Sequence, residues 1–177
     1  DNGPHQEGGN DPTFFRSAGS LRGIKGHLNE GGIRVPMIAR WTGKIKPNAV
    51  SDELFAHWDV LPTILSAARV STPREIDGIS FMPTLLGHEQ KNRHKYLYWE
   101  THENGSQQAI RKGDWKAIRL EPGKGLELYN LKRDLGESQN VATRNQNIVK
   151  DFETYLKSAR TRSLLWPITM PGKTAGR

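Results

Sequence analysis

A carboxylate and a carboxamide stand side by side at the start of the chain. Asp1 and Asn2 are followed by Gly3, which lets the backbone turn sharply. Hard cations such as calcium prefer oxygen ligands of this kind, but one calcium ion takes roughly six to eight of them. The same triplet is also typical of an ordinary turn. We therefore keep two interpretations open, a turn and one part of a metal site.

A lysine between two glycines is the next candidate for chemistry. Lys25 lies in the basic stretch that runs from Leu21 to Gly26, and its glycines Gly23 and Gly26 allow close approach of the backbone to a ligand. An ammonium group in such a loop can bind a tetrahedral oxyanion as a point charge. The alternative is a solvated loop charge. His5 is a similar case, because a histidine in a loop can donate a proton or bind a ligand but often does neither.

The segment that contains these candidates lacks regular hydrophobic periodicity. Residues 1–32 are rich in glycine and poor in apolar side chains, which indicates a long loop, and long loops often carry function. Residues 33–41 predict a short strand. Apolar side chains then recur at helical spacing, which predicts a helix over residues 59–68 with Asp59 as its N-cap.

Beyond residue 90 the pattern changes to short runs with β-branched or aromatic residues, separated by turns. Gly113 and Asp114 predict a tight hairpin, and apolar positions between Ile148 and Ala159 predict a terminal helix that lies across a sheet. We therefore predict two domains, residues 1–90 and residues 91–177. The four runs that predict an antiparallel meander are Tyr96–Glu100, Gln107–Arg111, Trp115–Leu120 and Leu126–Leu131.

Composition narrows the possible partners. The chain of 177 residues has no cysteine, so it offers neither disulfides nor a cysteine nucleophile. No apolar run approaches the roughly 20 residues that span a bilayer, so we expect no membrane span. The formal charge of +7 suits an anionic partner, but the basic residues are spread along the chain, which argues against nucleic acid. The chain has no initiator Met and no signal sequence at its start, so we expect it to be an internal piece of a longer protein.

Several motifs in order resemble the second half of the type I sulfatases, the arylsulfatase A-like members of the alkaline phosphatase superfamily. Asp1 to Pro4 is similar to the family's metal-binding Asp-Asn-Gly segment. The stretch from Gly23 to Pro36 is similar to its Lys-Gly and Glu-Gly-Gly-x-Arg-x-Pro signature. Further matches, in chain order, are Asp59 to Thr63, Asp77 to Ser80, Leu85 to Gly87, Ala109 to Lys116, Glu127 to Leu131, and Glu137 with Asn140.

The resemblance implies roles for individual residues. In the family the Asp and Asn of the first motif bind a divalent cation, usually calcium, so Asp1 and Asn2 take that role here. The signature lysine contacts the sulfate group, which makes Lys25 the implied substrate-binding and catalytic residue. His5 is close enough in sequence to face the substrate and is the second implied catalytic residue. Glu30 is expected, with Arg34, to shape the loop.

The resemblance also implies a fold and an activity. The expected fold class is α/β: the C-terminal part of an alkaline-phosphatase-like α/β sandwich, then a small four-stranded antiparallel sheet with a packed C-terminal helix. The activity is that of a sulfuric ester hydrolase acting on aryl or carbohydrate sulfates through a formylglycine. That residue is made in a Cys/Ser-x-Pro-x-Arg motif, which this sequence lacks. The chain alone is therefore expected to be inactive without the upstream half of the same polypeptide, and the resemblance implies a periplasmic or secreted enzyme.

Two other functions stay open at this point. A phosphodiesterase or phosphonate hydrolase of the same superfamily could use the same metal and lysine on a phosphoryl group. A noncatalytic module could bind sulfated glycans through its basic surface. In each case the partner is a sulfated or phosphorylated molecule.

Overall fold

The computed structural model describes residues 2–103 and 105–170, which form two compact units. One unit is Pro36–Lys95, and the other combines the residues before Pro36 with those from Tyr96 onward. The predicted boundary at residue 90 is close to one of these changes, but the residues before Pro36 group with the C-terminal part. The division of the whole protein into domains stays a prediction.

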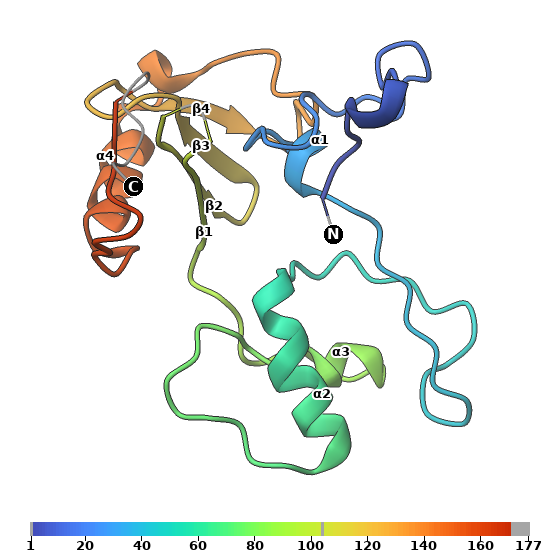
Figure 1. Cartoon of the computed structure of the whole chain (residues 1–177). Helices are drawn as coiled ribbons and strands as arrows, with labels where there is room; N and C mark the ends of the chain where they lie inside the picture. Colours follow the sequence, from blue (N-terminus) through green and yellow to red (C-terminus); the bar gives the residue numbers. More distant parts are fainter. Residues whose placement is uncertain (1, 104, 171–177) are drawn as a thin grey trace. The chain divides into compact units, whose positions relative to one another are not determined.

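The larger unit is built on an antiparallel sheet with strand order β1-β2-β3-β4 (Figure 1). The register pairs Trp99 with Ala109, and Ala117 with both Ile110 and Leu128. The predicted meander is therefore confirmed. Its strands are β1 (Leu97–Thr101), β2 (Gln107–Lys112), β3 (Trp115–Arg119) and β4 (Glu127–Asn130).

Successive side chains of a strand point to opposite faces of a sheet. Both faces of this sheet are covered by other segments of the unit. On one face Ile110, Ala117 and Leu128 pack against Phe152 and Leu156 of the helix α4 (Gln146–Ser158). This confirms the predicted terminal helix, which lies beside the sheet in Figure 1. A short 3-10 helix, Ala142–Arg144, leads into it.

The opposite face of the sheet is covered by the N-terminal segment. Ala109, Ile118 and Tyr129 enclose Leu28, whose side chain is 5% exposed. The segment contains a 3-10 turn at Glu7–Gly9 and the one-turn helix α1 (Glu30–Ile33). The long loop that we predicted thus forms part of a hydrophobic core.

The smaller unit contains the predicted helix, α2 (Val60–Ala68), after a 3-10 turn at His57–Asp59. A second short helix, α3 (Met82–Leu85), packs beside it. The hydroxyl of Thr63 donates to the carbonyl of Asp59 at 2.6 Å and accepts from the amide of Phe81 at 3.0 Å. Among the described residues no helix is long and apolar enough to cross a membrane.

One local prediction is wrong, and one is confirmed in position but not in its hydrogen bond. Residues 33–41 form no strand, because the amides of Ile33 and Arg34 donate to the carbonyls of Asn29 and Glu30 and so close a helical turn. Asp59 stands at the N-cap position of α2, but its side chain makes no capping hydrogen bond. It accepts hydrogen bonds from other parts of the unit instead.

Candidate anion-binding site

The segments that contain Asn2, His5 and Lys25 lie side by side (Figure 1). The amide of Lys25 donates to the carbonyl of Pro4 at 2.9 Å, and the amide of Gly3 donates to the carbonyl of Gly32 at 2.9 Å. Two stretches separated by about twenty residues of sequence are thus held together through their backbones. The structure brings the predicted candidates Asn2, His5 and Lys25 to one place. Asp1 lies outside the described residues.

The ammonium group of Lys25 is partly exposed and paired with a carboxylate. Its Nζ lies 3.0 Å from Oε1 of Glu7, and its side chain is 43% exposed. The hydrogen bond from Lys25 holds the pKa of Glu7 below its usual range. The ammonium group of Lys25 therefore already binds an anionic group of the same chain.

The same turn selects one tautomer of the neutral His5 ring. The amide of Glu7 donates to Nδ1 of His5 at 3.1 Å. A ring nitrogen that accepts a hydrogen bond carries no proton, so the neutral ring has its proton on Nε2. His5 can therefore donate a hydrogen bond from Nε2.

The described residues do not make up a calcium site by themselves. Within residues 2–103 and 105–170 no group of three or more His, Cys, Asp or Glu side chains could hold a metal ion. Asn2 donates from Nδ2 to the carbonyl of Gly3 at 2.9 Å, an arrangement that fixes the carboxamide. The donor set around Asn2 is too small for the six to eight oxygens of calcium.

The loop that carries Lys25 is fixed at both ends by Glu137. Arg22 donates from Nη1 to the main-chain carbonyl of Glu137 at 2.9 Å, and to the hydroxyl of Tyr129 at 3.1 Å. The amide of Glu30 donates to Oε2 of Glu137 at 2.6 Å. Glu137 is fully buried and has a left-handed backbone, with φ of 51°. One residue, more than a hundred positions away, thus holds both ends of the loop.

A buried ion cluster surrounds this attachment. Nζ of Lys116 is fully buried, 2.9 Å from Oε1 of Glu30 and 3.0 Å from Oε1 of Glu137. The second contact is an ion pair outside hydrogen-bond geometry. Arg111 and Arg34 approach Oε2 of Glu30 at 3.3 and 3.7 Å, and burial lowers the pKa of Arg111. Two carboxylates therefore share one buried ammonium and two guanidinium groups.

The sequence assigned no role in the site to Lys116 or Glu137. A signal for Lys116 was present, because a lysine between Trp115 and Ala117 interrupts an apolar strand. Such a residue is buried only when it is paired. Glu137 gave no local signal, since it lies in a polar turn.

The close approach of the backbones explains the glycine pair after Glu30. A Cβ on Gly32 would lie 2.0 Å from the carbonyl oxygen of His27, which no side chain can tolerate. The helical turn α1 can therefore lie against the Lys25 loop only if this position is glycine.

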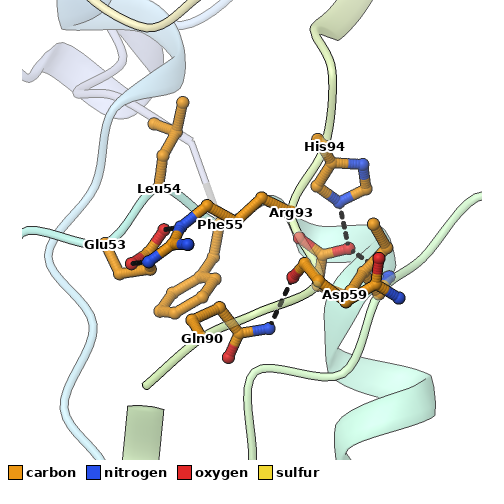
Figure 2. Close-up of a pocket in the computed structure, with 9 residues that line it drawn as sticks. Glu53, Leu54, Phe55, Asp59, Gln90, Arg93 and His94 are labelled. Atoms are coloured by element: carbon orange, nitrogen blue, oxygen red, sulfur yellow. Dashed lines mark hydrogen bonds and ion pairs between the residues drawn. The ribbon is translucent and has the colours of Figure 1, made fainter. Parts of the chain in front are cut away.

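A second polar cluster lies within the smaller unit (Figure 2). Asp59 is fully buried and accepts from the amides of Ala56 and Ile79, and its Oδ1 lies 2.7 Å from Nε2 of His94. Arg93 forms a two-pronged ion pair with Glu53 at the edge of the same pocket. Asp59 therefore ties together the start of α2 and two loops, which is a structural role.

Comparison with protein families gives one family model. The model described as N-sulphoglucosamine sulphohydrolase, C-terminal, matches residues 24–162. It includes Lys25, the glycine pair, Lys116 and Glu137, but not the first motif.

Comparison with curated proteins finds similar sequences among sulfatases. The chain is 37% identical to a steryl-sulfatase of Rattus norvegicus over 137 residues, 69% of the chain and 22% of that relative. It is 30% identical to an N-acetylgalactosamine-6-O-sulfatase of Bacteroides thetaiotaomicron over 184 aligned residues, 92% of the chain and 35% of that relative. The chain thus matches about a fifth to a third of the length of these relatives.

Comparison with solved structures supports the same fold. A structure from work on glycosaminoglycan metabolism by Bacteroides thetaiotaomicron matches with a TM-score of 0.74 at 30% identity, over 91% of this chain and 37% of that chain. A sulfatase of Pseudoalteromonas sp. matches with a TM-score of 0.69 at 25% identity, over 90% of this chain and 35% of that chain. The expected α/β fold class is confirmed.

Proposed function

Since this chain belongs to the sulfatase family, we propose that it is part of an enzyme that hydrolyses sulfate esters and that Lys25 binds the sulfate group. The observation that supports this proposal best is the arrangement of Lys25. Its loop is held against residues 2–5 by backbone hydrogen bonds, and its ammonium group already binds a carboxylate.

Lys25 would act by stabilising negative charge. When the ester bond breaks, charge develops on the oxygens of the sulfate group and on the leaving oxygen. A fixed ammonium group favours that charge more than it favours the ground state, and only such a difference accelerates the reaction. The attachment of both loop ends to Glu137 would keep the ammonium group in place before the substrate arrives.

His5 would supply a hydrogen bond to the substrate. Its Nδ1 accepts from the amide of Glu7, so Nε2 is the protonated nitrogen of the neutral ring. A donor so oriented can hydrogen-bond to an ester oxygen.

Asp1 and Asn2 are proposed as two ligands of a divalent cation, for which calcium is our expectation. Such an ion would polarise the sulfate oxygens. Because the described residues provide too few ligands, the others would come from the remainder of the enzyme. The proposed nucleophile, a formylglycine, would also come from there, because this sequence has no Cys/Ser-x-Pro-x-Arg motif.

The test uses the full-length protein with an aryl sulfate, a carbohydrate sulfate and a phosphodiester. We expect sulfate esters to be hydrolysed faster than the phosphodiester. Lys25→Ala should reduce kcat by about 10²–10³-fold, the usual cost of removing a donor that stabilises transition-state charge. Lys44→Ala, which changes an exposed lysine of the smaller unit, is the control.

Two outcomes would contradict the proposal. Faster turnover of the phosphodiester would favour a phosphoryl hydrolase. Equal activity of Lys25→Ala and the unchanged protein would remove Lys25 from the site.

The proposed metal has its own test. Loss of activity on adding a chelator, with recovery on adding calcium, would support it.

A further inference from the structure

Asn2 and Gly3 form a pair of residues that react with each other in unfolded chains. The main-chain nitrogen of a glycine can lose its proton and attack the side-chain carbonyl carbon of a preceding asparagine, because glycine has no Cβ to hinder the approach. A bond forms between that nitrogen and Cγ, the side-chain amide leaves as ammonia, and a succinimide ring remains. Water then opens the ring to aspartate or isoaspartate. Asn2 is exposed, so water can reach it.

The packing of Gly3 makes this reactive pair unavoidable in the fold. Gly3 is buried, and a Cβ on it would lie 1.8 Å from the carbonyl oxygen of Gly31 and 3.0 Å from Cα of Gly32. These are backbone atoms, which cannot move aside as the end of a flexible side chain can. A larger residue at position 3 would slow the attack, but it would also push residues 2–4 away from α1.

The folded structure keeps the attacking nitrogen occupied. The amide of Gly3 donates to the carbonyl of Gly32 at 2.9 Å, within the same close contact. The carboxamide of Asn2 is held as well, since its Nδ2 donates to the carbonyl of Gly3 at 2.9 Å. To reach Cγ of Asn2, the nitrogen of Gly3 must give up its hydrogen bond, and a buried donor without an acceptor costs free energy. Attack therefore requires that residues 2–4 first separate from α1.

The position of α1 depends on the buried ion cluster. The carbonyl of Gly32 belongs to this helical turn, whose first residue, Glu30, is bound by both Glu137 and Lys116. Segments of a folded protein can open locally at a lower free energy than global unfolding requires. Weakening the cluster should therefore make the nitrogen of Gly3 reactive without unfolding the sheet.

We propose that Asn2 is a deamidation site that the folded Lys25 loop protects, and that Asn2 reacts when α1 separates from residues 2–4. The reaction replaces a neutral carboxamide by a carboxylate, and the isoaspartate product also lengthens the main chain by one carbon atom. If Asn2 is a ligand of the proposed cation, either product changes that site permanently. This consequence rests on the proposed function, whereas the reaction at Gly3 does not.

The first test compares deamidation of the full-length protein when it is folded and when it is unfolded in urea, at the same mildly alkaline pH. Peptide mass spectrometry would give the fraction of Asn2 converted with time. A peptide with the sequence of residues 1–10, measured in both buffers, corrects for the effect of urea on the chemistry. We expect Asn2 to react on the order of tenfold more slowly in the folded protein, because only the open form reacts. Equal corrected rates would overturn the proposal.

Two destabilised variants separate local opening from global unfolding. Lys116→Met weakens the cluster that holds α1, whereas Leu156→Ala removes a buried side chain of α4 from the other face of the sheet. The deamidation rate of Asn2 in the folded protein should rise several-fold in Lys116→Met and less than about twofold in Leu156→Ala. If Lys116→Met does not fold, Arg111→Gln, which removes one guanidinium group from Glu30, gives the same comparison. Equal rates in the cluster variant and in Leu156→Ala would reject the separation of α1 as the cause.

The mass measurement does not depend on catalysis, so the two proposals can fail separately. If the unchanged protein hydrolyses no sulfate ester, the proposed function is wrong, and the deamidation rates still decide on the protection of Asn2. If the unchanged protein is active, its activity should fall in proportion to the converted fraction of Asn2. Full activity after conversion would overturn the consequence for the metal site.

Discussion

The ammonium group of Lys25 is paired with the carboxylate of Glu7, a residue of the same site. The carboxylate lies on the ammonium group at 3.0 Å, and both side chains reach solvent. A sulfate group that binds Lys25, as we propose, must displace Glu7 or bind beside it. Glu7 is therefore a competitor for the same charge, in addition to being the residue that orients His5 through its amide.

Replacing Glu7 with Gln should strengthen anion binding. The amide side chain is neutral, so it competes less for Lys25 and no longer repels a sulfate. We expect the affinity for inorganic sulfate to rise by a factor of about 1.5 to 5, the range of a surface ion pair. Titration followed by NMR would measure it, with Glu75→Gln as the control because Glu75 is exposed in the smaller unit.

The same competition predicts a dependence on pH. Lys25 holds the pKa of Glu7 below the usual value of 4.5, so the pair persists above that pH and is lost as the pH falls through the lowered pKa. The advantage of Glu7→Gln in sulfate affinity should therefore disappear at low pH. An advantage that persists when Glu7 is protonated would mean that charge is not its cause.

At the scale of elements, the loop around Lys25 is fixed by a buried charge on a strand. Lys116 of β3 reaches both Glu30 and Glu137. A buried ion pair adds little compared with an apolar replacement of both partners, but removal of one partner leaves an uncompensated charge. Removal of Lys116 should therefore cost more free energy than the ion pair contributes, because two buried carboxylates would lose their partner.

Lys116→Met should therefore destabilise the chain by about 3–5 kcal/mol. Denaturant unfolding would measure the loss. Lys112→Met is the matched control on the neighbouring strand, because Lys112 pairs with Asp151 at the surface, and it should cost less than about 1 kcal/mol. If both variants lose the same stability, burial does not distinguish the two lysines.

The elements were predictable to different degrees for physical reasons. The meander and α4 follow from periodicity, since apolar side chains such as Ile110 and Phe152 repeat with the spacing of a strand or a helix. The predicted strand over residues 33–41 was wrong because α1 takes up the backbone donors at its start. A short apolar run does not show whether its backbone N–H groups already donate to carbonyls of the preceding turn.

The candidate site was predictable only in part. Asn2, His5 and Lys25 were identified from residue type and motif, and the structure brings them together. Their attachment to Glu137 was not visible, because the contact between Glu30 and Glu137 spans 107 positions. Nothing in a local pattern indicates a partner so far away.

For the molecule as a whole, alkaline pH should weaken the fold through a buried tyrosine. Burial, helped by a hydrogen bond to Glu127, raises the pKa of Tyr129 from 10.0 to about 12. A raised pKa means that the folded state favours the protonated form. The stability due to Tyr129 is complete below pH 10 and is lost as the pH rises towards 12.

The unfolding free energy should accordingly fall by about 2 kcal/mol across this range because of Tyr129. Tyr129→Phe should remove that part of the pH dependence and lower the stability at neutral pH, where the hydrogen bonds to Glu127 and Arg22 are lost. Urea unfolding at several pH values would measure both effects. An unchanged slope in the phenylalanine variant would assign the alkaline loss to other groups.

The long reach of Glu137 has a consequence for how the protein is made. A ribosome releases Lys25 and Glu30 well before Glu137, which follows Glu30 by 107 residues. Until Glu137 emerges and β3 supplies Lys116, the loop lacks the groups that hold its ends. The Lys25 loop is thus among the last parts to acquire its shape during synthesis, although it is translated well before Glu137. On a ribosome stalled before residue 137, the Lys25 loop should therefore still be open to protease.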